Sequence, residues 1–160
     1  RRIDQPGGCV LPHLPRDQRR CPAPSGRAHL TVNHFDPVTV PEGRLLLQTL
    51  RSHDQYNTTI YGLDDRYRGI HAGRRVVFAH RRDLEDLGWH DGDVVDVVSE
   101  WEDGVDRRAP GFRLVAYDVA RGTCAAYFPE TNVLVPLGSV AEESNTPTSK
   151  AVVVRFEPAS

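Results

Sequence analysis

Short runs of aliphatic and β-branched residues, each bounded by glycine, proline, asparagine or aspartate, recur along most of this 160-residue chain. Such runs are typical of β-strands, and many short strands separated by turn residues are typical of a small barrel or sandwich. The chain is therefore predicted to be mainly β. The predicted strands are 28–32, 44–49, 75–79, 94–99, 112–119, 124–128 and 151–156.

One segment between these strands, residues 80–87, predicts a short helix. Its acidic residues Asp83, Glu85 and Asp86 suit the positive N-terminal end of a helix, and Gly88 follows as a C-terminal stop. No internal repeat is evident, apart from two similar valine-rich runs at 94–98 and 151–154.

Length and charge bound the class of protein. A chain of this length fits one domain that buries about two-thirds of its surface. The net charge of −2 argues against a general electrostatic grip on nucleic acid or on an anionic membrane. No apolar run approaches the roughly 20 residues of a membrane helix, and the start is not a signal peptide. We expect no nucleic-acid partner and no membrane insertion. The three cysteines indicate a reducing, cytoplasmic setting.

The first thirty residues differ from the rest, with five prolines and six arginines against two aspartates. Because proline disrupts helices and central strands, we predict an extended arm or interdomain linker over residues 1–25 and a folded domain over 26–160. The chain opens on two arginines and contains no methionine, so we expect it to be a piece of a longer protein.

The arm also contains one conceivable set of zinc ligands, namely Cys9, His13, Cys21 and His29. This set lacks the tight C-x2-C pair of most structural zinc sites. A zinc-stabilised arm that mediates protein contacts therefore stays a weaker alternative.

A polar stretch follows the predicted strand 44–49. Residues 51–61 supply a guanidinium, an imidazole, amides, hydroxyls and phenols. Such groups are costly to bury without partners, which favours a polar ligand at the end of this strand. The alternative is a plain connecting loop, because Asn, Asp, Thr and Ser also satisfy their own turns. A hydrolytic site at Ser52-His53-Asp54 is rejected, because adjacent residues of an extended segment point to opposite faces.

The next loop, residues 62–69, alternates in charge and is bounded by glycines. We predict a surface loop in which Asp64 and Asp65 form exposed, weak pairs with Arg66 and Arg68.

Four motifs taken together resemble a known family. They are the helix-glycine-Asp-Gly-Asp-strand passage 84–95, the loop 49–58, the segment Pro129-Glu130-Thr131-Asn132, and Pro147-Thr148-Ser149-Lys150 before a valine-rich strand. In this order they resemble the C-terminal molybdopterin-dinucleotide-binding domain of the molybdopterin oxidoreductases. The resemblance is nearest to the formate dehydrogenase-like branch, which includes the YdeP-type proteins, and it covers about residues 26–158.

The resemblance implies a six-stranded double-psi β-barrel with short helices, of the aspartate decarboxylase-like kind, that closes over bis-molybdopterin guanine dinucleotide. It also implies that the metal ligand and any iron–sulfur cluster lie in other domains of a parent oxidoreductase, which are then its partners. Such a domain binds cofactor but is not catalytic by itself. The main rival is a double-psi barrel that serves as an adaptor or substrate-binding module on ATPases, with no cofactor.

The cofactor is anionic and rich in amide-like ring edges, so its site needs cations, hydroxyls and amides. The resemblance implies cofactor contacts by Thr49, Arg51, His53, Gln55, Tyr56, Asn57, Thr58, Glu130, Asn132 and Lys150. Ordinary structural roles stay open as alternatives for several of these residues, and Tyr56 could be a core aromatic with its hydroxyl at the surface. Arg51 could pair with a surface carboxylate, Asn132 could cap the next turn, and Lys150 could be a solvated charge at a strand end.

Overall fold

The computed structural model describes residues 19, 23–34, 37–57 and 60–160. The chain divides into two units, one up to Pro37 and one from Val38 to Ser160. In the first unit the described residues form neither helix nor strand, so the strand predicted at 28–32 is wrong. The two large apolar side chains of this segment, Leu30 and Val32, are exposed. They bury too little surface to offset the entropy cost of ordering a strand.

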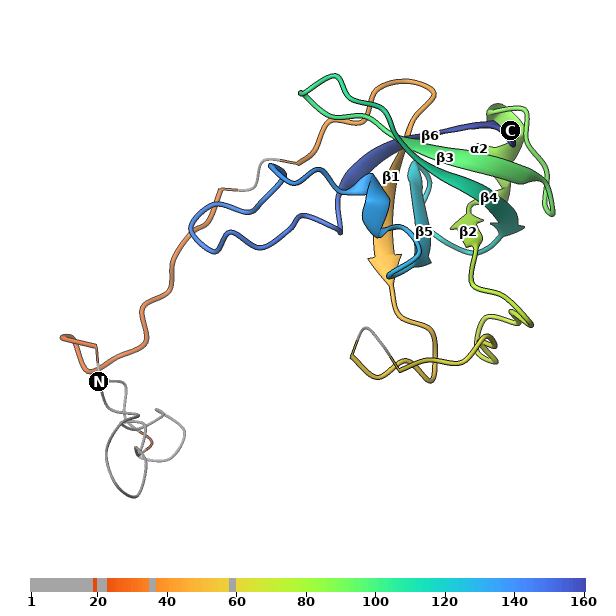
Figure 1. Ribbon diagram of the computed structural model, residues 1–160. Helices are drawn as coiled ribbons and strands as arrows, with labels where there is room; N and C mark the ends of the chain where they lie inside the picture. Colours follow the sequence, from red (N-terminus) through yellow and green to blue (C-terminus); the bar gives the residue numbers. More distant parts are fainter. Residues whose placement is uncertain (1–18, 20–22, 35–36, 58–59) are drawn as a thin grey trace. The chain divides into compact units, whose positions relative to one another are not determined.

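The second unit is a closed barrel of six strands. The strands are β1 (Leu45–Leu50), β2 (Val76–Ala79), β3 (Val94–Ser99), β4 (Arg107–Ala116), β5 (Thr123–Tyr127) and β6 (Val152–Pro158). Around the barrel they follow the order β1-β5-β2-β4-β3-β6 (Figure 1). The pairs β1–β5 and β2–β4 are parallel, and the other four neighbouring pairs are antiparallel.

This pairing contains an internal two-fold relation. If β1 is exchanged with β4, β2 with β5, and β3 with β6, every neighbour and every strand direction stays the same. The predicted six-stranded double-psi β-barrel is therefore confirmed. The two valine-rich runs noted in the sequence lie in β3 and β6, which this relation makes equivalent and which also pair with each other.

Apolar side chains fill the barrel, and one strand is buried on both faces. Val77 and Ala79 of β2 belong to the main core, whereas Val76 and Phe78 belong to a second cluster together with Ile70 from the loop before β2. All four residues of β2 are buried for this reason. The loop that leads into β2 is thus packed against the barrel rather than left free in solvent.

Among the predicted strands that form, β4 differs most from its expected bounds, because it spans Arg107–Ala116 rather than 112–119. In the structure two residues of β4, Pro110 and Gly111, lie opposite the single residue Asp96 of β3, between the pairs Val95–Phe112 and Val97–Ala109, so β4 carries a β-bulge here. The Asp96 carboxylate there accepts a hydrogen bond from the Gly111 amide at 3.0 Å. A bulge accommodates both proline and glycine inside a strand.

The predicted helix is present as α2 (Arg81–Asp86), and a 3₁₀ turn, η1 (Asn132–Leu134), follows β5. At its start the His80 side chain caps α2 by accepting a hydrogen bond from the Arg82 amide. Within the described residues, no helix has the length and apolar character that a membrane crossing requires.

Gly88 ends α2 in a Schellman motif. Its amide donates to the Glu85 carbonyl at 3.0 Å, and the Trp89 amide donates to the Leu84 carbonyl at 2.8 Å. Gly88 has φ +79°, a left-handed conformation that costs other residues about 1 kcal/mol. Gly88→Ala should therefore lower the free energy of unfolding by about 1 kcal/mol, as measured by urea denaturation. Gly62→Ala is the control, because Gly62 has no positive φ and open space around its Cα. Equal losses in the two variants would contradict this account.

Candidate functional site

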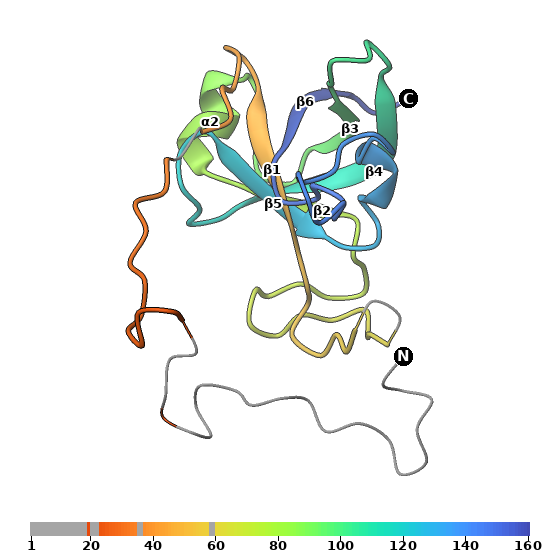
Figure 2. The same cartoon turned by 90° about the vertical axis from the view of Figure 1, so that its left-hand side faces the viewer.

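Two parallel strands end side by side at one end of the barrel, where the polar stretch begins. β1 and β5 pair at Leu50 and Tyr127, and the Phe128 amide donates to the Leu50 carbonyl at 3.0 Å. β6 runs antiparallel to β1 and begins at this end, where the Thr49 amide donates to the Ser149 carbonyl at 3.1 Å. We call this the loop end of the barrel (Figures 1 and 2). Its described residues are 51–57, 60–75, 128–132 and 149–151.

Arg74 connects the loops of this end. Its side chain is only 3% exposed. It donates to Ser52 Oγ at 2.5 Å and to Gln55 Oε1 at 3.0 Å, both in the loop after β1. It also donates to the Phe128 carbonyl at 2.9 Å and to Glu130 Oε1 at 2.6 Å, both after β5. One guanidinium group therefore joins the two polar segments that the sequence indicated separately.

Two tyrosine rings flank this guanidinium. Its Cζ atom lies 4.0 Å from the ring centre of Tyr61 and 4.7 Å from that of Tyr127. A cation held near aromatic rings gains electrostatic attraction from them, and more so where water is excluded. Tyr127 is fully buried and belongs to β5, so one side of Arg74 packs against the barrel itself.

A second buried charge, Asp65, supports the same loop. It is 1% exposed and accepts hydrogen bonds from the Tyr127 hydroxyl at 2.7 Å, from Arg68 Nη1 at 2.5 Å and from the Tyr67 amide at 3.1 Å. The prediction of an exposed, weak pair is therefore wrong for Asp65. Asp64 is exposed as predicted, with 68% of its side chain accessible, but its carboxylate lies 3.8 Å from His71 Nδ1 rather than beside either predicted arginine. The buried Tyr127 hydroxyl accounts for the difference, because it supplies a donor inside the protein.

These contacts also set the ionisation of Asp65. Burial favours its neutral form, but the hydrogen bonds from Tyr127 and Arg68 and the charge of Arg68 outweigh burial and leave its pKa below the ordinary value. Burial and the bond to Asp65 raise the pKa of Tyr127.

A pH dependence of stability follows from the lowered pKa of Asp65. A carboxyl group with a depressed pKa stabilises the fold above its unfolded pKa of about 4 and loses that contribution as the pH falls through its folded value. We expect the free energy of unfolding, measured in urea, to fall between pH 6 and pH 3. Asp65→Asn should make this fall smaller, and an unchanged fall would contradict the assignment. Asp64→Asn is the control.

Three of the predicted contact residues are engaged inside the protein. Gln55 Oε1 accepts from the Ser52 amide at 3.2 Å as well as from Arg74, and Gln55 Nε2 donates to the Phe128 carbonyl at 2.8 Å. Both carboxylate oxygens of Glu130 accept from Arg74. Thr49 is buried, and Ser149 accepts from its amide. Their side chains shape the loop end rather than present open hydrogen-bonding edges.

Five further predicted residues are exposed at the loop end: Arg51, Tyr56, Asn57, Asn132 and Lys150. Tyr56 exchanges backbone hydrogen bonds with Ile60, and Asn57 has a left-handed backbone at φ +54°. Asn132 is the first residue of η1, whose N-cap is Thr131, so Asn132 does not cap that turn. The Lys150 ammonium contacts the Thr49 carbonyl.

The last two predicted residues are His53 and Thr58. His53 packs edge-on against Tyr67, with ring centres 3.8 Å apart. Its buried Nε2 atom lies 3.3 Å from Asp54 Oδ1, yet it makes no hydrogen bond within the described part of the chain. The two atoms are close enough for an ion pair but are not aligned for a hydrogen bond, so Nε2 is unsatisfied. Thr58 lies outside the described residues.

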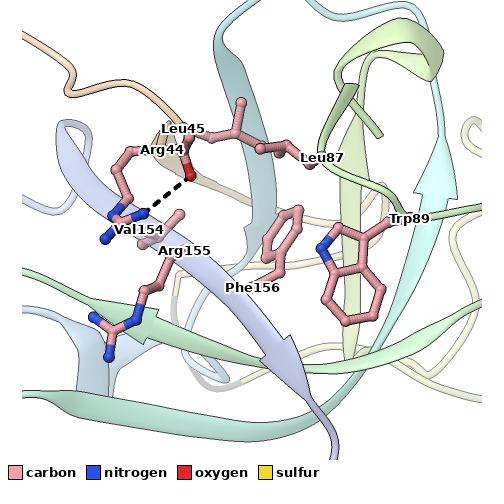
Figure 3. Close-up of a pocket in the computed structure, with 8 residues that line it drawn as sticks. Arg44, Leu45, Leu87, Trp89, Val154, Arg155 and Phe156 are labelled. Carbon is pink, nitrogen blue, oxygen red and sulfur yellow. Dashed lines mark hydrogen bonds between the residues drawn. The ribbon is translucent and has the colours of Figure 1, made fainter. Parts of the chain in front are cut away.

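Two cavities differ in their relation to this site. A cleft of about 740 Å³ is lined by Asn132 together with Pro136, Leu137 and Pro147, so it adjoins the loop end. A smaller pocket of about 180 Å³, where the Trp89 and Phe156 rings lie beside one another, is lined by none of the predicted residues (Figure 3).

Sequence reasoning missed Arg74 and Asp65. The only local signal for Arg74 was its position just before a short apolar strand, where an arginine is expected to be solvated. No group of three or more possible metal ligands occurs among the residues that the structure describes. Of the four conceivable zinc ligands, Cys9, His13 and Cys21 lie outside those residues.

Comparison with known protein sequences gives three findings. The sequence model of the molydopterin dinucleotide binding domain family matches residues 45–153. An uncharacterized oxidoreductase of Mycobacterium tuberculosis is 57% identical over 98% of this chain and 21% of its own length. Protein YdeP of Escherichia coli is 36% identical over 99% of this chain and 22% of its own length. The chain thus spans about a fifth of the length of these relatives.

A solved structure supports the fold. Acetylene hydratase from Pelobacter acetylenicus matches with a TM-score of 0.54 and 13% sequence identity, over 72% of this chain and 18% of that one. At this identity the likeness concerns the fold alone.

Proposed function

Because this chain belongs to the molydopterin dinucleotide binding domain family, we propose that it is the cofactor-binding part of a larger molybdenum-dependent oxidoreductase and binds bis-molybdopterin guanine dinucleotide at its loop end. The convergence of two polar loops on Arg74 carries this proposal. It places the exposed groups of both loops at the same end of the barrel as Lys150.

The residues present fit such a ligand. The planar guanidinium of Arg51 can donate two hydrogen bonds to pyrophosphate oxygens. The buried Nε2 of His53 has no hydrogen-bond partner among the described residues, so a ligand could supply one. Asn57 and Asn132 offer amides to ring edges, and Asn132 borders a cleft whose lining is mainly apolar but includes Asp103 and Arg107. When bound, the cofactor would supply the redox chemistry. This chain would hold and orient it and affect its potential through hydrogen bonds.

Titration by NMR tests this proposal. Adding bis-guanine cofactor, extracted from a purified molybdenum enzyme, to the 160-residue chain should shift the amide signals of residues 49–57 and 130–132. The signals of α2 should stay in place, because α2 follows the end of β2 that is remote from the loop end. Shifts that spread evenly over the barrel, or no shifts at saturating cofactor, would overturn the proposal and favour the adaptor alternative.

The finer part of the proposal concerns the parent enzyme. We place it in the formate dehydrogenase-like branch and in the cytoplasm, acting by two-electron oxidation of a small acid such as formate. The order of the loop motifs supports the branch, and the sparse cysteines support the location. Formate-dependent reduction of an artificial electron acceptor by the full-length parent would be the expected result. Reduction with another substrate but not with formate would overturn this part alone.

A further inference from the structure

We propose that Arg74 is a positioning residue for the ligand site. The identity of the ligand rests on the proposed function, whereas the contacts of Arg74 are independent of it. Its guanidinium fixes the loop after β1 and the loop after β5 relative to one another. The exposed side chains of both loops, among them Arg51 and Asn132, are thereby held in place before a ligand arrives.

The cross-link depends on few contacts. Beyond the ends of β1 and β5, the side-chain hydrogen bonds that the structure describes between the two loops are those of Arg74 and the single bond from Gln55 Nε2 to the Phe128 carbonyl. Gln55 is itself held by Arg74. Removing the guanidinium therefore removes most of the side-chain connection between the loops.

The shape of the group matters as much as its charge. Arg74 donates through Nε, Nη1 and Nη2 in different directions, toward Ser52, Gln55, Phe128 and Glu130. An ammonium group on a flexible stem has three donors on one atom and cannot reproduce a planar fork. Lysine at this position would keep the charge but could not reach both loops with the same geometry.

A second arginine with several carboxylate partners, Arg155, shows what is different at Arg74. Arg155 pairs with Glu100 at 2.7 Å, with Asp106 at 2.6 Å and with Glu157 at 2.8 Å. Arg155 and Glu157 lie in β6, Glu100 directly follows β3, and Asp106 directly precedes β4. These three strands pair with one another in the order β6-β3-β4. Those backbones are already joined by sheet hydrogen bonds, so Arg155 adds stability without fixing two separate loops. It is a matched control for Arg74.

Hydrogen exchange and ligand binding together test the proposal, with Arg74→Lys compared to Arg155→Lys in the 160-residue chain. Without ligand, Arg74→Lys should speed amide exchange in residues 51–57 and 128–132 together, by about tenfold or more, because charge-assisted hydrogen bonds are lost. Its affinity for bis-guanine cofactor should fall by roughly tenfold to a hundredfold. Arg155→Lys should lower the melting temperature but leave both readouts near wild type.

The possible results separate the positioning role of Arg74 from the proposed function. Unchanged exchange in both loops, or the same affinity in Arg74→Lys and wild type, would overturn the positioning role. If wild type binds no cofactor, the proposed function fails, and the exchange data still decide whether Arg74 joins the loops. Should Arg74→Lys not fold, Ser52→Ala removes one acceptor of Arg74 without burying a new charge and should give a smaller increase in exchange on both loops.

Discussion

Asp65→Ala is expected to lower the free energy of unfolding by about 3 kcal/mol, because removal of one partner from a buried ion pair leaves the other groups uncompensated. The Tyr127 hydroxyl and the Arg68 guanidinium would both lose their acceptor. The Tyr67 amide would lose its acceptor too. A single change in a loop should therefore cost as much as removing a core side chain.

Urea unfolding at pH 7 is the measurement, and the neighbouring residue provides the control. Asp64 is exposed and accepts one hydrogen bond, from the Ala72 amide at 2.8 Å. Asp64→Ala should lower the free energy of unfolding by about 1 kcal/mol or less. If the two alanine variants are equally stable, the carboxylate of Asp65 does not hold this loop, and our account of it is wrong.

The strands were predictable because their signal is local. The valine-rich runs of β3 and β6, and the apolar runs of β1, β2 and β5, carry their own β preference. The start of β4 was not predictable, because Pro110-Gly111 is a break in most contexts. These two residues fit inside β4 only because they form a β-bulge opposite Asp96 of β3. The run at 28–32 shows the converse, since local preference does not make a strand without a surface to pack on.

In the candidate site, too, features with a local sequence signal could be predicted and features that depend on long-range contacts could not. The polar loops could be found from sequence, because eleven consecutive residues with almost no aliphatic side chain are unusual after an apolar strand. The residue that joins them could not be found, because Arg74 lies 22 positions from Ser52 and 56 from Glu130. A long-range pairing of this kind leaves no periodic pattern. Gln55 and Glu130 therefore had to be reinterpreted once their partner was visible.

The side chain expected to matter most for cofactor affinity is one that is exposed at the loop end and not already engaged with Arg74. Gln55 and Glu130 are engaged with Arg74, whereas Arg51 is exposed at the loop end with its carbonyl accepting from Arg68 Nη1 at 3.3 Å. Arg51→Ala should weaken binding of bis-guanine cofactor by roughly tenfold to a hundredfold, because charge-assisted contacts to phosphate are among the strongest hydrogen bonds. The melting temperature should barely change, since the side chain is at the surface.

Isothermal titration of the 160-residue chain measures this effect. Arg82→Ala is the matched control, because Arg82 is also exposed but lies on α2, remote from the loop end. Arg51→Lys should fall between wild type and Arg51→Ala, since lysine keeps the charge but loses the fork. Equal affinities for Arg51→Ala and Arg82→Ala would mean that Arg51 does not bind the anionic part of the ligand. The proposal that the cofactor binds at the loop end would then be contradicted.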